Sequence, residues 1–156
     1  MRLHISRKQI AALFVLLATG FAAALSAGTL ARQEASSGAQ SLDYEFFKTR
    51  IEPIFLKRRP GHARCYACHA SGTGPQYLVK MSPGSTFWNE EQSRQNFESV
   101  SNLVNRDDPM NSKFLIHPLS PMAGGDITVV HGGGRQFESK DDPDWKTIAE
   151  WVSGKK

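Results

Sequence analysis

The sequence predicts an all-α domain, because two patterns that are specific to helices recur along the chain. Apolar residues repeat three or four positions apart in the segments 46–55, 97–104 and 145–152. Two of these segments follow strong helix-start signals, namely Asn89 with a glutamine three residues later and the pair Asp-Pro at 142–143. The chain has 156 residues, 40% of them hydrophobic, which is enough for one domain with a buried core and a short additional segment.

An uncharged, proline-free run of 21 residues, 10–30, follows three basic residues at the N-terminus. A helix needs about 20 apolar residues to span a bilayer, so we predict a signal-anchor transmembrane helix over residues 1–30. The basic residues before the run place the N-terminus in the cytoplasm by the positive-inside rule. A cleavable signal peptide is the alternative, with small residues at 22–24 or 26–28 as cleavage sites.

Both interpretations place the remaining chain outside the cytoplasmic membrane. A retained helix would give a single-pass protein of the inner membrane with its domain in the periplasm. Residues 31–41 are mostly small and polar, as in a flexible tether, and residues 42–156 form the predicted domain. Domains of this size are small, and small domains often need a covalent staple or a cofactor.

The first predicted helix begins at Ser41 or Asp43, either of which can cap it. Pro53 should kink this helix or end it early, and Pro-Gly at 60–61 breaks the chain before the two cysteines. Residues 70–85 are rich in Gly, Ser and Pro and predict a loop. The apolar face of the helix consists of Phe46, Phe47, Ile51, Ile54 and Phe55.

The middle helix begins at a capping box formed by Asn89 and Gln92 and should run to an Asp-Asp-Pro stop. A short helix is predicted over residues 112–117, where a proline follows it. Residues 119–140 contain five glycines and little periodicity, which predicts a long loop. The last helix begins after Asp142 and carries two tryptophans on its apolar face.

The motif with the most chemical information is Cys65-Tyr-Ala-Cys68-His69, which contains the only two cysteines of the chain. This spacing is typical of c-type haem attachment, in which two thiols bond the vinyl groups and the adjacent histidine binds the iron. A thioredoxin-like redox pair would need a βαβ context, and a zinc site would need further ligands near by. A structural disulfide would leave His69 unexplained. We therefore expect one covalent haem c, with its iron, on an exported domain.

The haem motif is part of a longer arrangement that resembles the planctomycete-type cytochrome c domains. The resemblance extends over about residues 42–154 and implies a cytochrome c-like helical fold around one haem. Apolar periodicity alone predicts only a mostly helical domain. The stretches that carry the resemblance are residues 53–69, 112–116, 131–134, 141–145 and 151–154.

The second axial ligand decides whether the iron of such a haem has all its coordination positions filled or keeps an open distal site. His131 is the main candidate, because it lies 62 residues after His69, in the loop where similar domains place this ligand, and three glycines follow it. Met122 and His117 are the alternatives, each next to a proline. A methionine ligand would raise the reduction potential relative to a second histidine.

A haem closed by two axial ligands predicts an electron-transfer protein with no catalytic residues and no small-molecule substrate. The rival hypothesis is a haem peroxidase or a gas-sensing domain with an open distal site. Such an enzyme would use an acid–base pair above the iron, for which Arg135 beside His131 is the candidate. A haem domain with a purely structural role is a third possibility.

A basic stretch just before the haem motif predicts a docking surface for an acidic partner. Its members Lys57, Arg58, Arg59 and Arg64 would steer the domain electrostatically towards that partner. The alternatives are a solvated helix face, or arginines that pair with the haem propionates. Three of the 19 Lys and Arg residues precede the apolar run, and the others nearly balance 15 acidic residues, which argues against nucleic-acid binding. The expected partner is a membrane-embedded redox complex, either a respiratory complex or a photosynthetic reaction centre.

Overall fold

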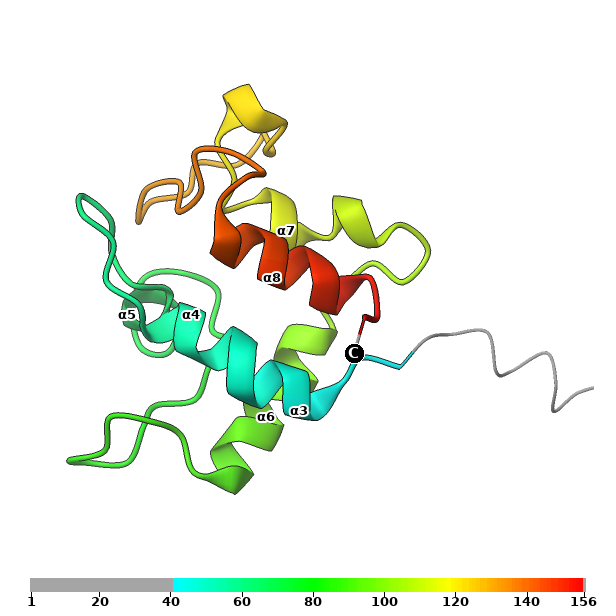
Figure 1. Ribbon diagram of the computed structural model, residues 1–156. Coiled ribbons are helices and arrows are strands. Elements are labelled where there is room, and N and C mark those ends of the chain that lie inside the picture. The colour runs from blue at the N-terminus through cyan, green and yellow to red at the C-terminus, as the bar shows by residue number, and fades with distance from the viewer. Residues whose placement is uncertain (1–40, 156) are drawn as a thin grey trace, which may run out of the picture. The chain divides into compact units, whose positions relative to one another are not determined.

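The computed structural model describes residues 41–155, and their regular structure is helical (Figure 1). β structure in this range is limited to isolated bridges between residues 59 and 62 and between 119 and 137. The predicted all-α class is therefore confirmed for the described part of the chain. In chain order the elements are α3 (Tyr44–Phe46), the π-helix η1 (Phe47–Ile51), α4 (Glu52–Leu56), α5 (Cys65–His69), α6 (Glu90–Ser101), the 3₁₀ turn η2 (Pro109–Asn111), α7 (Lys113–Ile116), the 3₁₀ turn η3 (Pro121–Ala123) and α8 (Pro143–Val152).

The predicted transmembrane helix, residues 1–30, lies outside the described residues, and so does the predicted tether up to residue 40. None of the helices within 41–155 combines the length and the apolar character that crossing a bilayer requires. The compact unit that holds the cysteine motif begins at Ser41, next to the predicted domain boundary.

The first helix is continuous from α3 through η1 to α4, with a π-helical stretch in its middle. Asp43 caps its start, because its carboxylate accepts a hydrogen bond of 2.7 Å from the backbone N–H of Phe46. Pro53 was predicted either to kink the first helix or to end it early. The early end is not found, because the helix continues to Leu56. Pro53 has no N–H to donate to the preceding turn, and the wider π-helical turn comes directly before it.

The capping signals of α6 and α8 form as predicted. Asn89 and Gln92 exchange hydrogen bonds of 2.9 and 3.1 Å in a capping box, and Asp142 accepts hydrogen bonds from the first turn of α8. The end of α6 differs from the prediction, because the helix stops at Ser101 rather than at the Asp-Asp-Pro sequence. Tight turns closed by backbone hydrogen bonds to Val100 and Ser101 replace its last helical turn.

The core is an aromatic cluster centred on Trp151 of α8, which is fully buried. Its ring centroid lies 5.2 Å from that of Phe47, 6.2 Å from Phe97 and 6.1 Å from Phe114, so four separate elements meet there. The indole N–H donates a 2.9 Å hydrogen bond to the backbone carbonyl of Asp43. This cluster joins α8 to the first helix, which lie near each other in Figure 1.

Replacing Trp151 by Ala should lower the free energy of unfolding by about 3–5 kcal/mol, because it removes a buried aromatic ring and leaves a cavity. Chemical denaturation followed by far-UV circular dichroism measures the change. The matched control is Phe87→Ala, because the Phe87 side chain is 67% exposed. That change should cost less than about 0.5 kcal/mol. Equal losses in the two variants would contradict the packing described here.

Candidate functional site

The two cysteines and the histidine of the motif open onto one cavity of about 580 Å³. This volume lies within the range of roughly 300–1,000 Å³ that is typical of cofactor and ligand sites. One wall is α5 and the opposite wall is the loop around residues 129–133. Apolar side chains from the first helix, α7 and α8 complete it, among them Phe55, Phe114, Phe137 and Ile148.

The thiols of Cys65 and Cys68 both line the cavity from a single helical turn. Residues three positions apart share one face of a helix, which explains why both sulfurs reach the same space. Both cysteines are free, and burial raises the pKa of the Cys65 thiol to about 11. The turn packs closely on the chain that follows, because a Cβ at Gly72 would lie 2.6 Å from the carbonyl oxygen of Ala67.

The imidazole of His69 is held in one orientation by the loop after α5. Its Nδ1 lies 2.8 Å from the carbonyl oxygen of Pro75, and its ring stacks on Tyr77 with centroids 4.2 Å apart. A carbonyl oxygen only accepts hydrogen bonds, so Nδ1 carries the proton and the lone pair of Nε2 is left for a metal. The side-chain amide of Gln76 closes the loop by donating to the carbonyls of Cys68 and Gly74.

His131 lies on the opposite wall and is anchored in the same way. Its Nδ1 lies 2.7 Å from the carbonyl oxygen of Gly134, which again leaves Nε2 free to bind a metal. Gly134 has a φ of +83°, a left-handed conformation that favours glycine, so the turn depends on that residue. The loop is tied to the chain before α5 by a 3.1 Å hydrogen bond from Ala63 N–H to Gly133 O and by the Gln136 amide.

The rings of His69 and His131 both line the cavity, with centroids 6.2 Å apart and planes inclined by 43°. A bond from a metal to an imidazole nitrogen is about 2.0–2.1 Å, and each ring nitrogen lies roughly 1 Å from its ring centre. Two imidazoles on opposite sides of one metal ion therefore need centroids roughly 6 Å apart, as found here. Burial also lowers the pKa of both histidines, which favours the neutral form that binds metals.

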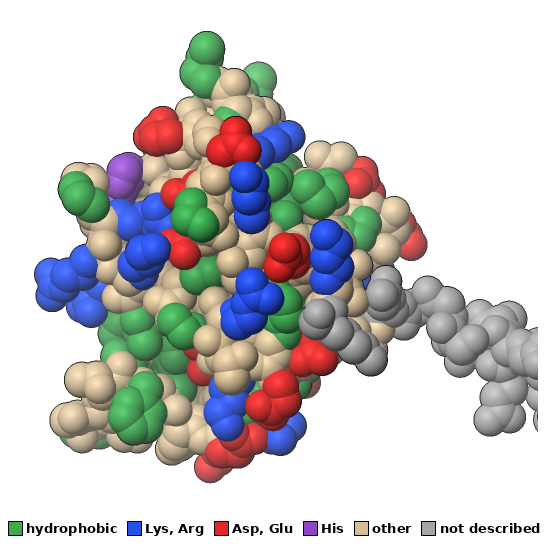
Figure 2. Space-filling view, viewed as in Figure 1, with side chains coloured by type: hydrophobic (Ala, Val, Ile, Leu, Met, Phe, Trp, Pro, Cys, Tyr) green, Lys and Arg blue, Asp and Glu red, His purple; other side chains and the backbone are tan. Residues whose placement is uncertain are grey.

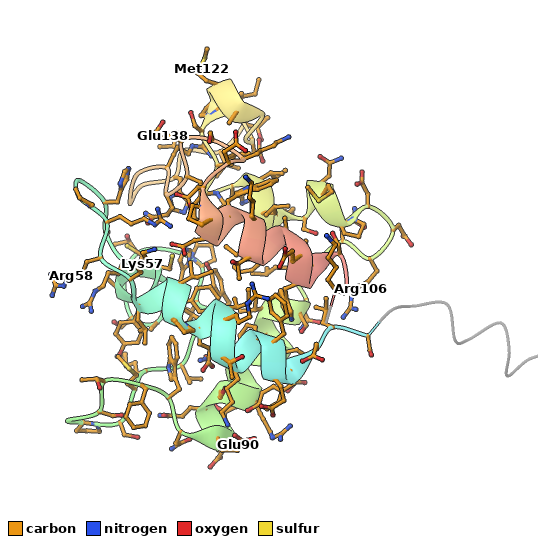
Figure 3. The ribbon with its side chains drawn as sticks, viewed as in Figure 1. Lys57, Arg58, Glu90, Arg106, Met122 and Glu138 are labelled. Carbon is orange, nitrogen blue, oxygen red and sulfur yellow. The ribbon has the colours of Figure 1, made fainter. Side chains whose placement is uncertain are left out.

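The two alternative ligands have different surroundings. The Met122 side chain on η3 is 96% exposed and projects away from the domain (Figure 3). His117 does line the cavity, but its Nε2 lies 3.0 Å from a carboxylate oxygen of Asp126. The structure therefore brings His131 together with His69, leaves Met122 in solvent and pairs His117 with an acid.

Arg135 does not form the distal acid–base pair that an open haem enzyme would use. Its guanidinium donates hydrogen bonds to the backbone carbonyls of His117, Asp126 and Val129. The residue is absent from the lining of the cavity. Its donors therefore hold the loop and do not point at a ligand above His69.

The four predicted docking residues are not equivalent. Lys57 pairs with Asp144 at 2.6 Å, and Arg59 pairs with both Asp142 and Asp144 at the start of α8. Arg64 is half-buried and lines the cavity. Arg58 is exposed and extends away from the domain (Figure 3), on the side where Figure 2 shows a group of basic side chains.

Several residues that shape the site carried no signal in the sequence. Gln136 is a buried amide whose partners lie 73 residues away at Ala63 and close by at Gly133 and Gly134. Tyr77 and Pro75 fix the ring of His69 from a segment that looked like an unremarkable loop. A buried polar residue in a glycine-rich stretch has no characteristic spacing, so only the folded contacts identify it.

The site thus consists of two thiols and two anchored imidazoles that line one largely apolar cavity, with the imidazole centroids 6.2 Å apart. This donor set fits a group that offers two sites for thioether bonds and one metal ion with two open axial positions. Comparison of the chain with protein-family models, with curated proteins and with solved structures finds no match, so the interpretation of the site depends on its own geometry.

Proposed function

We propose that this domain is a c-type cytochrome that transfers electrons. Cys65 and Cys68 would hold one haem by thioether bonds, with His69 and His131 as the axial ligands of its iron. The observation that carries the proposal is the pair of imidazoles whose centroids are 6.2 Å apart in the cavity that both cysteines line.

The bound haem would supply an iron that gains and loses one electron. The chain's own residues keep that site rigid. The carbonyls of Pro75 and Gly134 fix the tautomer and the direction of each imidazole. The apolar walls restrict water, and both the ligands and the burial of such a site tune its reduction potential.

Two axial histidines favour electron transfer over catalysis, because they leave no position on the iron for a substrate. The rival proposal, a peroxidase or gas sensor, would need a polar distal group that faces the iron. Arg135, the candidate for that role, donates its hydrogen bonds to loop carbonyls instead. This observation favours the electron carrier.

The predicted N-terminal anchor suggests where the domain works. If residues 1–30 remain as a membrane helix, the tether confines the domain to the outer, periplasmic face of the inner membrane. Its partner would be a membrane-embedded redox complex, such as a respiratory complex or a photosynthetic reaction centre. Arg58 is the most available of the predicted docking residues, because Lys57 and Arg59 already pair with the acids of α8.

The proposal predicts that full-length protein from a host that attaches haem to exported proteins contains one haem per chain. The reduced spectrum should not change when carbon monoxide is added, because both axial positions are filled. A pyridine haemochrome assay gives the haem content, and absorbance spectra with and without carbon monoxide test the coordination. A wild-type protein that binds carbon monoxide readily would favour the peroxidase or gas-sensor alternative instead.

A further inference from the structure

We infer that Arg135 is a positioning residue, which holds His131 over the cavity by clamping the loop that carries it. The inference rests on the proposed role of His131 as an axial ligand. Arg135 would act through the backbone of the loop and would touch neither the haem nor its iron.

The contacts of the guanidinium define the clamp. Arg135 Nη2 donates to the carbonyl oxygens of Asp126, at 2.7 Å, and Val129, at 2.5 Å, and Nη1 donates to the carbonyl of His117. The planar fork of an arginine can present several N–H groups at once in fixed directions. One side chain therefore joins the end of α7 to two points in the loop that leads to His131.

The position of these contacts explains why they matter for the ligand. His131 lies between Val129 and Arg135, so the clamp fixes the chain on both sides of the imidazole. A second contact also links the start of this segment to its middle, because His117 Nε2 lies 3.0 Å from a carboxylate oxygen of Asp126. The two ends of the segment 117–135 are thus held together by polar contacts.

Two large apolar side chains in the middle of this loop contribute little to its placement. Met122 is 96% exposed and Ile127 is 80% exposed. Leu119 is fully buried at the start of the segment, but the two exposed side chains that follow it gain little from the hydrophobic effect. In this part of the loop, hydrogen bonds from Arg135 and from Gln136 supply the contacts that hold the chain.

The test compares Arg135→Gln and Arg135→Lys in the full-length holoprotein. Lysine keeps the positive charge but has a compact ammonium group that cannot reproduce the fork. In both variants we expect the fraction of haem that binds carbon monoxide to rise about tenfold, a change that the loss of one hydrogen bond's free energy can produce. The high-spin fraction of the oxidised spectrum should rise with it.

Two controls separate positioning from a general loss of stability. Arg94→Gln removes an exposed arginine that pairs with Glu90 on α6, and its spectrum should stay unchanged. Val100→Ala weakens the buried core away from the loop and should lower stability without opening the iron.

Each outcome bears on the inference. The inference would be overturned if neither Arg135 variant bound more carbon monoxide than the wild-type protein. It would also be overturned if the lysine variant alone stayed like the wild type, because the positive charge and not the clamp would then be responsible. Increased carbon monoxide binding in Val100→Ala would also overturn the inference, since any loss of stability would then have the same effect. Failure of the wild-type chain to attach haem would instead reject the proposed function, so the two failures are distinguishable.

Discussion

Replacing both Cys65 and Cys68 by Ala should abolish covalent haem attachment, and the variant should lose most of the stability of the folded domain. The two thiols are the only cysteines of the chain, and both line the cavity of about 580 Å³. Without thioether bonds the haem can dissociate, and an empty cavity of this size destabilises a small domain. Haem staining of a denaturing gel and thermal unfolding followed by circular dichroism measure the two effects.

The single variants Cys65→Ser and Cys68→Ser serve as matched controls for this experiment. Each should retain one thioether bond and leave one vinyl group free, which shifts the pyridine haemochrome band to an intermediate position. The proposal would be falsified if mass spectrometry of the wild-type chain, produced with a haem-attachment system, gave the mass of the bare chain with a Cys65–Cys68 disulfide.

His131→Ala should open the iron to carbon monoxide and raise its spin state. The reason is geometric, because His131 is the imidazole whose ring centroid lies 6.2 Å from that of His69. Met122→Ala is the matched control, since Met122 is 96% exposed, and it should change neither property. Absorbance spectra of the oxidised protein and of the reduced protein with carbon monoxide distinguish the two variants.

A third variant, His131→Met, gives the same assignment a sharper readout. A thioether ligand raises the reduction potential relative to a second histidine. It also adds a weak charge-transfer band near the red end of the oxidised spectrum. If Met122→Ala were the variant that opened the iron, the loop would have to rearrange in the holoprotein, and His131 would not be the ligand.

Features that depend on neighbouring residues were predictable from the sequence. The capping box of Asn89 and Gln92 and the start of α8 at Asp142 form as expected, because each involves groups within three positions of one another. The two thiols share a face of α5 for the same reason. The end of α6 was not predictable, because turns at Val100 and Ser101 compete closely with one more helical turn.

The tertiary structure alone decided which residues meet across the cavity. The sequence favoured His131 over Met122 and His117 as the partner of His69, but spacing alone left all three candidates open. Their placement depends on contacts between distant segments, such as Gln136 with Ala63, 73 residues apart. The basic stretch shows the same dependence, because Arg59 pairs with Asp142, 83 residues away, and is therefore less available to the predicted docking surface.

The sequence by itself therefore determined the helical class, the helix starts and the spacing of the Cys-x-x-Cys-His motif, since these follow from hydrogen bonds and spacing within one or two turns. The roles proposed for His131 and Arg135 could be inferred only from the fold. A glycine-rich loop has many accessible conformations of similar energy, and only hydrogen bonds to segments remote in the sequence select one of them.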